Sequence, residues 1–145
     1  MAKLKVVIDT NILISAAFLK ASPLPDTIYQ ALKHHRFLLV TSPDIIKEID
    51  DVINRETIIA RTQMTLKERT SFIQNLIEIS IITTGQTTIP PTSRDIKDDK
   101  FLICAYESQA DYLITGDKDL LILKQYQSTE IVTPNKFISI LESQK

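Results

Sequence analysis

The chain has 145 residues, of which 43% are hydrophobic and 24% charged, a composition typical of a globular domain rather than of a disordered chain. The formal net charge is −1, so no strong overall field attracts nucleic acid or an acidic membrane. Any nucleic-acid contact must therefore come from a local basic patch or a metal. The lone cysteine, Cys104, excludes an intrachain disulfide framework and fits a reducing compartment.

The N-terminus lacks the pattern of a signal peptide, because Asp9 and Asn11 interrupt its first apolar run. No apolar stretch approaches the roughly 20 residues that span a bilayer. We therefore expect a cytoplasmic protein without membrane contact, folded as a single domain over residues 1–145.

Strand and helix patterns alternate from the start of the chain. The run Leu4–Ile8 is rich in β-branched residues and suits a strand buried on both faces. A helix then continues through Ala17, with Thr10 or Asn11 as its N-cap.

The rest of the chain keeps this alternation. Pro23 and Pro25 break the chain before the next helix, Ser42 and Pro43 start another, and Thr65 opens a capping box. The further predicted strands are Phe37–Val40, Ile79–Thr83, Tyr112–Thr115 and Glu130–Thr133. The further predicted helices are Asp26–His35, Asp44–Ile53, Thr65–Ile77, Asp98–Ser108, Lys118–Leu123 and Pro134–Leu141, with a loop at Gln86–Arg94. This order predicts an α/β fold, with a parallel sheet and helices on both faces.

Acidic residues follow the ends of these predicted strands. Asp9 ends the first strand and Asp117 comes just after the strand at 112–115, where open α/β sheets place their ligand crevices. Asp98 and Asp99 begin a helix, whose dipole favours negative charge there. A carboxylate at the end of a buried strand is costly unless water, donors or a metal receive it, so Asp9 is the strongest candidate.

A further acid lies on the helix after the second strand. Glu48 borders the apolar stripe of this helix, and Asp50 borders the same stripe from the other side. The helical wheel does not choose between the two.

Carboxylates that converge on one crevice repel each other, and a cation is needed to neutralise them at neutral pH. With no histidine or cysteine nearby, oxygen ligands favour Mg²⁺ or Mn²⁺ over zinc. Such a metal activates water and holds a phosphate oxygen, as in phosphodiester cleavage. Each acid also has a structural interpretation: Asp98 and Asp99 as helix caps, Asp117 and Asp119 as turn residues, Glu48 as solvated helix surface.

Four segments of the chain together resemble PIN-domain ribonucleases, especially the branch of toxins in type II toxin–antitoxin systems. These segments are Val7–Ala16, Ser42–Ile49, Arg94–Leu102 and Ala110–Leu121, and the similarity runs from about Lys5 to Leu141. The resemblance implies a three-layer α/β/α PIN-like fold with a central parallel sheet. It also implies a Mg²⁺- or Mn²⁺-dependent endoribonuclease that cleaves single-stranded RNA with metal-activated water.

The resemblance also implies the site residues. Carried over by position, Asp9, Glu48 and Asp117 are catalytic acids that hold the metal. The remaining acid falls at Asp99 by its spacing to Asp117, or at Asp98 by the Asp-x-x-Asp pattern that begins at Asp95. The supporting residues are Thr10, Asn11 and Thr115, which would orient the ligands by hydrogen bonds, and Asp119 as an extra acid.

Three other classes compete with this interpretation. A receiver domain also gathers acids around Mg²⁺, but the helix-rich span between Glu48 and Ile79 fits its regular alternation poorly. A haloacid-dehalogenase-type phosphatase needs Asp-x-Asp after its first strand, and this chain has Asn11 at the second position. A catalytically silent PIN scaffold that binds RNA or protein is the main alternative.

Partners are the final expectation. Isoleucines and leucines are abundant on the helices at 26–35, 44–53 and 65–77, and an unburied apolar patch usually marks an interface. We expect a homodimer, and for a toxin also an antitoxin segment that sends a basic side chain into the acidic crevice.

Overall fold

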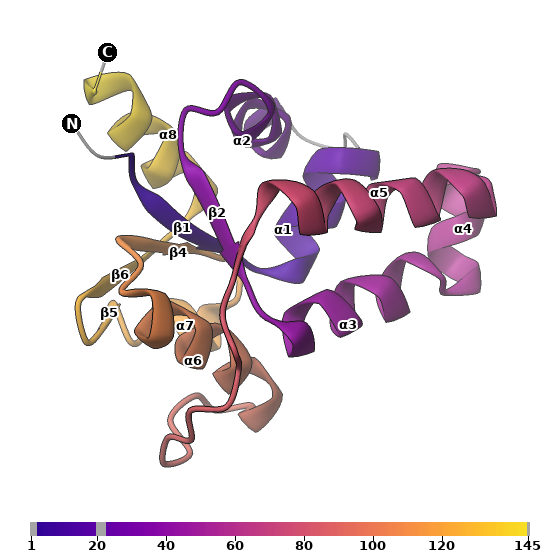
Figure 1. Cartoon of the computed structure of the whole chain (residues 1–145). Coiled ribbons are helices and arrows are strands. Elements are labelled where there is room, and N and C mark those ends of the chain that lie inside the picture. Colours follow the sequence, from indigo (N-terminus) through magenta and orange to yellow (C-terminus); the bar gives the residue numbers. More distant parts are fainter. Residues whose placement is uncertain (1–2, 20–22, 145) are drawn as a thin grey trace.

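A six-stranded sheet forms the centre of the computed structural model, which describes residues 3–19 and 23–144 (Figure 1). The strand order is β3-β2-β1-β4-β6-β5, and all neighbouring strands are parallel except β5, which is antiparallel to β6. The strands are β1 Lys5–Ile8, β2 Leu38–Thr41, β3 Ile81–Ile82, β4 Tyr112–Ile114, β5 Gln125–Tyr126 and β6 Thr129–Val132. The predicted α/β class with a mostly parallel sheet flanked by helices is confirmed.

Ten helical segments connect these strands within the described residues. They are α1 Thr10–Ile14, the π-helical turn η1 Ser15–Leu19, α2 Pro23–Lys33, α3 Pro43–Ile53, α4 Glu56–Thr62, α5 Leu66–Ile79, the 3₁₀ turn η2 Ile96–Asp98, α6 Asp99–Ser108, α7 Lys118–Leu121 and α8 Pro134–Ser143. None of these described helices is long and apolar enough to cross a bilayer.

Strand β1 lies at the centre of the sheet, paired with β2 on one side and β4 on the other. Val6 and Val7 are fully buried, as expected for a strand covered on both faces. Helix α6 packs against β1, β2 and β4, while α2 and α8 pack together on the opposite side of the sheet (Figure 1). Phe137 of α8 meets the rings of Phe37 and Tyr112 with centroids 5.3 and 5.9 Å apart, which fastens α8 to the sheet.

The predicted helix starts at α3 and α5 are confirmed. The Ser42 hydroxyl accepts a hydrogen bond from the Ile45 N–H at 3.4 Å, and Pro43 is the first helical residue. Thr65 and Glu68 form the predicted capping box, with backbone-to-side-chain distances of 3.1 and 2.9 Å. Helices α3 and α5 lie side by side, and α4 joins their far ends (Figure 1).

Some boundaries differ from the sequence prediction. Helix α2 begins at Pro23 instead of Asp26, because a proline in the first turn lacks only an N–H that has no helical partner there. The N-cap of α1 is Asp9 rather than Thr10 or Asn11. The Asp9 carboxylate accepts the capping hydrogen bond one residue before the predicted position.

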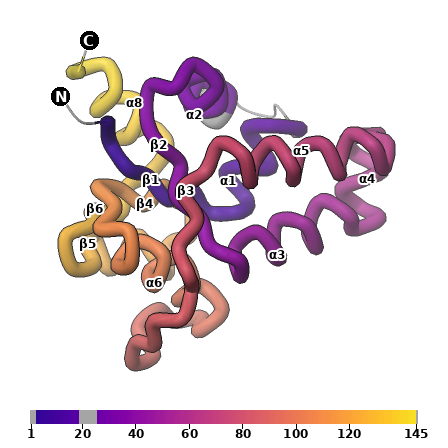
Figure 2. The backbone as a smooth tube through the Cα atoms, in the orientation of Figure 1, coloured from indigo at the N-terminus to yellow at the C-terminus, as the bar shows by residue number. Residues whose placement is uncertain are grey.

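Helix α4 and strand β5 were not predicted at all. Helix α4 buries no residue, and its N-cap residue Arg55 makes no capping hydrogen bond. The sequence therefore shows neither an apolar stripe nor a cap from which this helix could be predicted. Strand β5 is two residues long and pairs antiparallel with β6, which the pattern of parallel strands and crossover helices does not predict. Residues 83–95 form a long irregular connection that contains the loop predicted at Gln86–Arg94, while the strand predicted at Ile79–Thr83 is reduced to Ile81–Ile82 (Figure 2).

Candidate active site

Asp9 is fixed at the carboxyl end of β1 by its neighbours. Ile8 pairs with Ile114 of β4, so the residues that follow these strands lie together at one edge of the sheet. The Thr115 hydroxyl donates a hydrogen bond to one carboxylate oxygen of Asp9, and the Ile12 N–H donates to the other at 3.0 Å. These bonds leave the carboxylate a single orientation.

The carboxylate of Asp9 is also poorly solvated, since the residue is 6% exposed. Burial raises its pKa, hydrogen bonds from Thr115 and Ile12 lower it in part, and the negative charge of Asp117 raises it again. The net effect is a raised pKa. A nearby cation would therefore stabilise the ionised form of this buried carboxylate.

Glu48 reaches the same region from α3. The Thr10 hydroxyl donates to its Oε2 atom, and the Lys100 ammonium lies 2.7 Å from Oε1. The Lys100 side chain is 19% exposed and that of Glu48 is 30% exposed. Asp50, the other candidate on this helix, is exposed and accepts a hydrogen bond from the Asn54 amide, so the structure places Glu48 rather than Asp50 on the Asp9 side.

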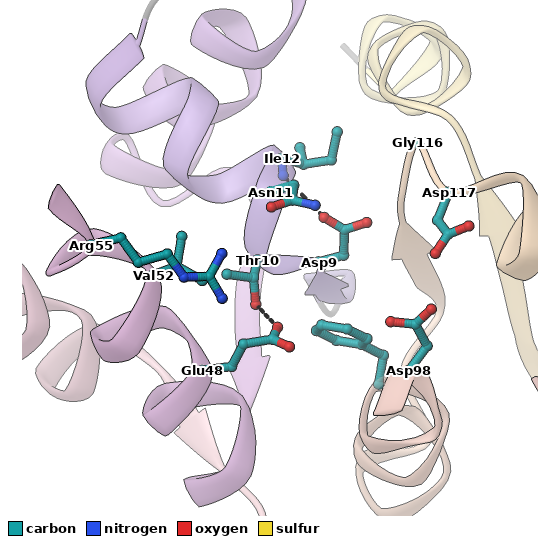
Figure 3. Close-up of a pocket in the computed structure, with 11 residues that line it drawn as sticks. Asp9, Thr10, Asn11, Ile12, Glu48, Val52, Arg55, Asp98, Gly116 and Asp117 are labelled. Carbon is teal, nitrogen blue, oxygen red and sulfur yellow. Dashed lines mark hydrogen bonds between the residues drawn. The ribbon is translucent and has the colours of Figure 1, made fainter. Parts of the chain in front are cut away.

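Asp98 lies across from Asp9, at the junction of η2 and α6, and faces Asp117 (Figure 3). Its pKa is raised to about 7, first because of burial, then through its hydrogen bond with Asp117 and the negative charges of Asp117, Asp95 and Asp9. Burial and the neighbouring negative charges therefore favour the neutral, protonated form of Asp98 when no cation is bound.

Asp99 has a different position from its neighbour. Its carboxylate accepts the Thr92 N–H at 3.1 Å and the Ser93 N–H at 2.8 Å, and the residue is 6% exposed. It therefore fastens the end of the 83–95 connection to α6. Of the two alternatives left open by the sequence, Asp98 is the one that the structure brings to Asp9.

Asp117 caps the short helix α7, where its carboxylate accepts the Asp119 N–H at 2.9 Å. Its own N–H donates to the Thr115 hydroxyl at 3.0 Å, so Thr115 links Asp9 to Asp117. The Asp119 side chain is 39% exposed and lies 3.9 Å from Arg94. Asp119 does not join the other acids.

These side chains line one cavity of about 510 Å³ at the carboxyl ends of β1 and β4 (Figure 3). The lining residues are Asp9, Thr10, Asn11, Ile12, Glu48, Val52, Arg55, Asp98, Phe101, Gly116 and Asp117. The expected convergence of Asp9, Glu48, Asp98 and Asp117 on one crevice is thus present, with Thr10 and Asn11 beside them. Arg55 was not predicted, because it precedes a helix that has no sequence signal.

The donors of this cavity fit a hard divalent cation. They are carboxylate and hydroxyl oxygens, with no histidine or cysteine among the lining residues. Within the described residues, however, no three histidine, cysteine, aspartate or glutamate side chains stand close enough together to form a ready-made cage. This arrangement suits Mg²⁺, which keeps several waters and takes only one or two carboxylates directly.

Comparisons with known proteins agree with this geometry. A family model for the PIN domain matches residues 5–119, which include β1, the acids of the cavity and the start of α7. The chain is also 33% identical to the uncharacterized protein MJ1680 of Methanocaldococcus jannaschii over 151 aligned positions, covering 97% of this chain and 93% of that protein. PIN domains are a family of typically metal-dependent ribonucleases. The chain belongs to the PIN domain family.

Proposed function

We propose that the protein is an endoribonuclease that uses Mg²⁺ or Mn²⁺ to cleave single-stranded RNA. One observation carries the proposal: four carboxylates from four different elements line one cavity, two of them, Asp98 and Asp117, face each other, and Arg55 is the one cationic residue among the described lining residues. Repulsion of this kind weakens the folded state until a cation binds between the carboxylates, and acids arranged in this way are typical of a functional site.

The residues proposed to hold the metal are Asp9, Glu48, Asp98 and Asp117. When bound, the cation would activate a water molecule and stabilise the negative charge of the phosphodiester. Thr115 orients the Asp9 carboxylate and Thr10 orients that of Glu48, so both ligands are positioned before any metal arrives. Asp99 and Asp119 are left out of this set because they lie outside the cavity.

Among the described residues, the lining of the cavity contains no cysteine, serine or histidine that could act as a nucleophile. Burial raises the pKa of the Cys104 thiol to about 12, and the residue is fully buried in the core. Water is therefore the nucleophile that the proposal requires.

Cleavage of a labelled single-stranded RNA tests the proposal. We expect cleavage with Mg²⁺ or Mn²⁺, none with a chelator, and a loss of at least about 100-fold for Asp9→Asn. Asp119→Asn is the matched control, because it removes the same charge from a residue outside the cavity and should keep wild-type activity. Undiminished cleavage by purified Asp9→Asn protein would contradict the proposal.

A catalytically silent scaffold that binds RNA or protein is the second candidate. It is favoured by the ion pair between Lys100 and Glu48, at 2.7 Å, which already balances one of the four carboxylates. Calorimetric titration with Mn²⁺ separates the two: the nuclease binds Mn²⁺ and loses this binding in Asp9→Asn, whereas a silent scaffold binds no metal at this cavity.

We also propose that the protein is the toxin of a toxin–antitoxin pair and that it forms a homodimer. The toxin role is supported by the resemblance of the sequence to that branch, and the dimer by four isoleucines that stay 41–44% exposed near the β3 edge: Ile77, Ile79, Ile81 and Ile82. The toxin role is tested by two observations: a small reading frame beside the gene and growth arrest on expression would both support it. Light scattering that shows a monomer at high concentration would exclude the dimer.

A further inference from the structure

Arg55 is the one cationic residue among those that line the acidic cavity in the described part of the chain. It stands at the corner between α3 and α4, and its side chain extends toward Thr10 and Glu48 rather than toward the facing pair Asp98 and Asp117 (Figure 3). The residue is exposed, and its guanidinium makes no hydrogen bond or ion pair with any residue that the structure describes. Its charge is therefore available to a ligand.

A second hollow of about 330 Å³ continues from the cavity over α3. Its lining residues are Asp44, Lys47, Glu48, Asp51, Arg55 and Lys100, so it shares Glu48 and Arg55 with the acidic cavity. Lys100 is already paired with Glu48 at 2.7 Å. Lys47 is exposed and has no ion pair among the described residues, which makes Arg55 and Lys47 the two unpaired cations of this hollow.

We propose that Arg55 and Lys47 form a subsite, here called the rim subsite, for the phosphodiester next to the one that lies at the acids. This inference rests on the proposed function, because it assumes single-stranded RNA in the cavity. Four carboxylates against one guanidinium make the cavity repel the RNA backbone, so the strand needs cations where it leaves. A guanidinium suits this role because its planar fork binds two phosphate oxygens at once.

An acid of the same hollow should affect RNA binding in the opposite direction to the two cations. Asp51 lines the hollow together with both cations, and it is exposed. A phosphate bound at the rim subsite is repelled by this carboxylate, so its removal should strengthen binding.

Fluorescence anisotropy with a labelled oligouridylate of about a dozen nucleotides, in EDTA to prevent cleavage, measures this binding directly. We expect Arg55→Gln to weaken binding about fivefold. The slope of the logarithm of the binding constant against the logarithm of the salt concentration should become less steep by about 0.7. Lys47→Gln should weaken it about twofold, Arg55→Lys should lie between wild type and Arg55→Gln, and Asp51→Asn should tighten binding.

Arg61→Gln is the matched control, because Arg61 is an exposed arginine on α4 that lines neither hollow. It changes the net charge as much as Arg55→Gln does and should leave the affinity unchanged. In cleavage assays Arg55→Gln should raise KM more than it lowers kcat, since the neighbouring phosphate is bound equally in the ground and transition states.

Equal weakening by Arg55→Gln and Arg61→Gln would overturn the proposal, because only net charge would then count. Wild-type affinity in Arg55→Gln, with metal-dependent cleavage by the wild type intact, would overturn the rim subsite and leave the nuclease function standing. A wild-type protein that neither binds nor cleaves the RNA would overturn both.

Discussion

On the α3 side of the acidic cavity, Glu48 has both oxygens occupied, one by the Thr10 hydroxyl and one by the Lys100 ammonium. On the α6–α7 side, Asp98 and Asp117 face each other, and neither forms an ion pair with a cation of residues 3–19 or 23–144 (Figure 3). The fold therefore neutralises one carboxylate and leaves the others in mutual repulsion. This difference indicates where an added cation would gain most, namely between Asp9, Asp98 and Asp117.

The largest expected effect is on cleavage. Asp98→Asn should lower kcat/KM at least about 100-fold, because it removes a charge from the side that has no counter-ion. Glu48→Gln should cost only about tenfold, because the Glu48 charge is already balanced by Lys100. Steady-state kinetics of both variants on one RNA measure the ratio. Equal losses of kcat/KM would show that the two sides of the cavity contribute equally to cleavage, contrary to this prediction.

The neighbouring acid should respond in stability rather than in chemistry. Asp99→Asn replaces a carboxylate that accepts two backbone N–H groups by an amide that offers only one acceptor oxygen to them. We expect the free energy of unfolding to fall by about 2 kcal/mol, measured by urea denaturation in EDTA. Asp95→Asn is the control, since Asp95 caps an exposed turn and asparagine caps equally well. Asp98→Asn should instead stabilise the metal-free protein.

This contrast between Asp98 and Asp99 also shows how far the sequence leads. The strand-end position of Asp9 and Asp117, and the amphipathic helix that carries Glu48, were readable from apolar runs and helix signals. Adjacent helical residues point about 100° apart, and which of them faces the cavity depends on how η2 turns into α6, which spacing alone does not determine.

The position of Arg55 beside the cavity could not be predicted from the sequence, for a related physical reason. Its position depends on the corner between α3 and α4, and α4 has no buried residue and no side-chain cap to announce it. A lone arginine in such a segment looks like solvated surface. Only the three-dimensional packing of α3 against α1 and α6 shows that this corner borders the acids.

The effect of Lys100 on metal affinity tests the difference between the two sides of the cavity. Its ammonium occupies the cation position on Glu48, and its positive charge opposes that of an incoming Mn²⁺. We expect Lys100→Gln to bind Mn²⁺ about tenfold more tightly, seen as a lower Mn²⁺ concentration at the midpoint of the thermal-shift titration.

Lys136→Gln is the control for that titration, because Lys136 forms a comparable ion pair with Glu130, at 3.0 Å, away from the cavity. It should leave the midpoint unchanged. Weaker Mn²⁺ binding by Lys100→Gln would mean that Lys100 positions Glu48 for the metal instead of competing with it.

The smallest expected effect concerns the far end of α6, where Glu107 holds the start of the 83–95 connection. Desolvation raises the pKa of Glu107, but hydrogen bonds outweigh it, among them those from the Thr87 and Gly85 N–H groups at 3.1 and 2.9 Å, and lower the pKa to about 2. The carboxylate therefore stabilises the fold fully above its unfolded pKa of about 4.5, and this contribution is lost as the pH falls toward 2. Because the group is well exposed to solvent, the contribution should stay below about 1 kcal/mol.

Glu107→Gln should thus be slightly less stable than wild type at pH 7 and equal to it near pH 2, in urea melts at several pH values. Glu78→Gln, on the exposed side of α5, should keep the wild-type profile, and a pH-independent effect of Glu107→Gln would show that the carboxylate charge does not hold the connection.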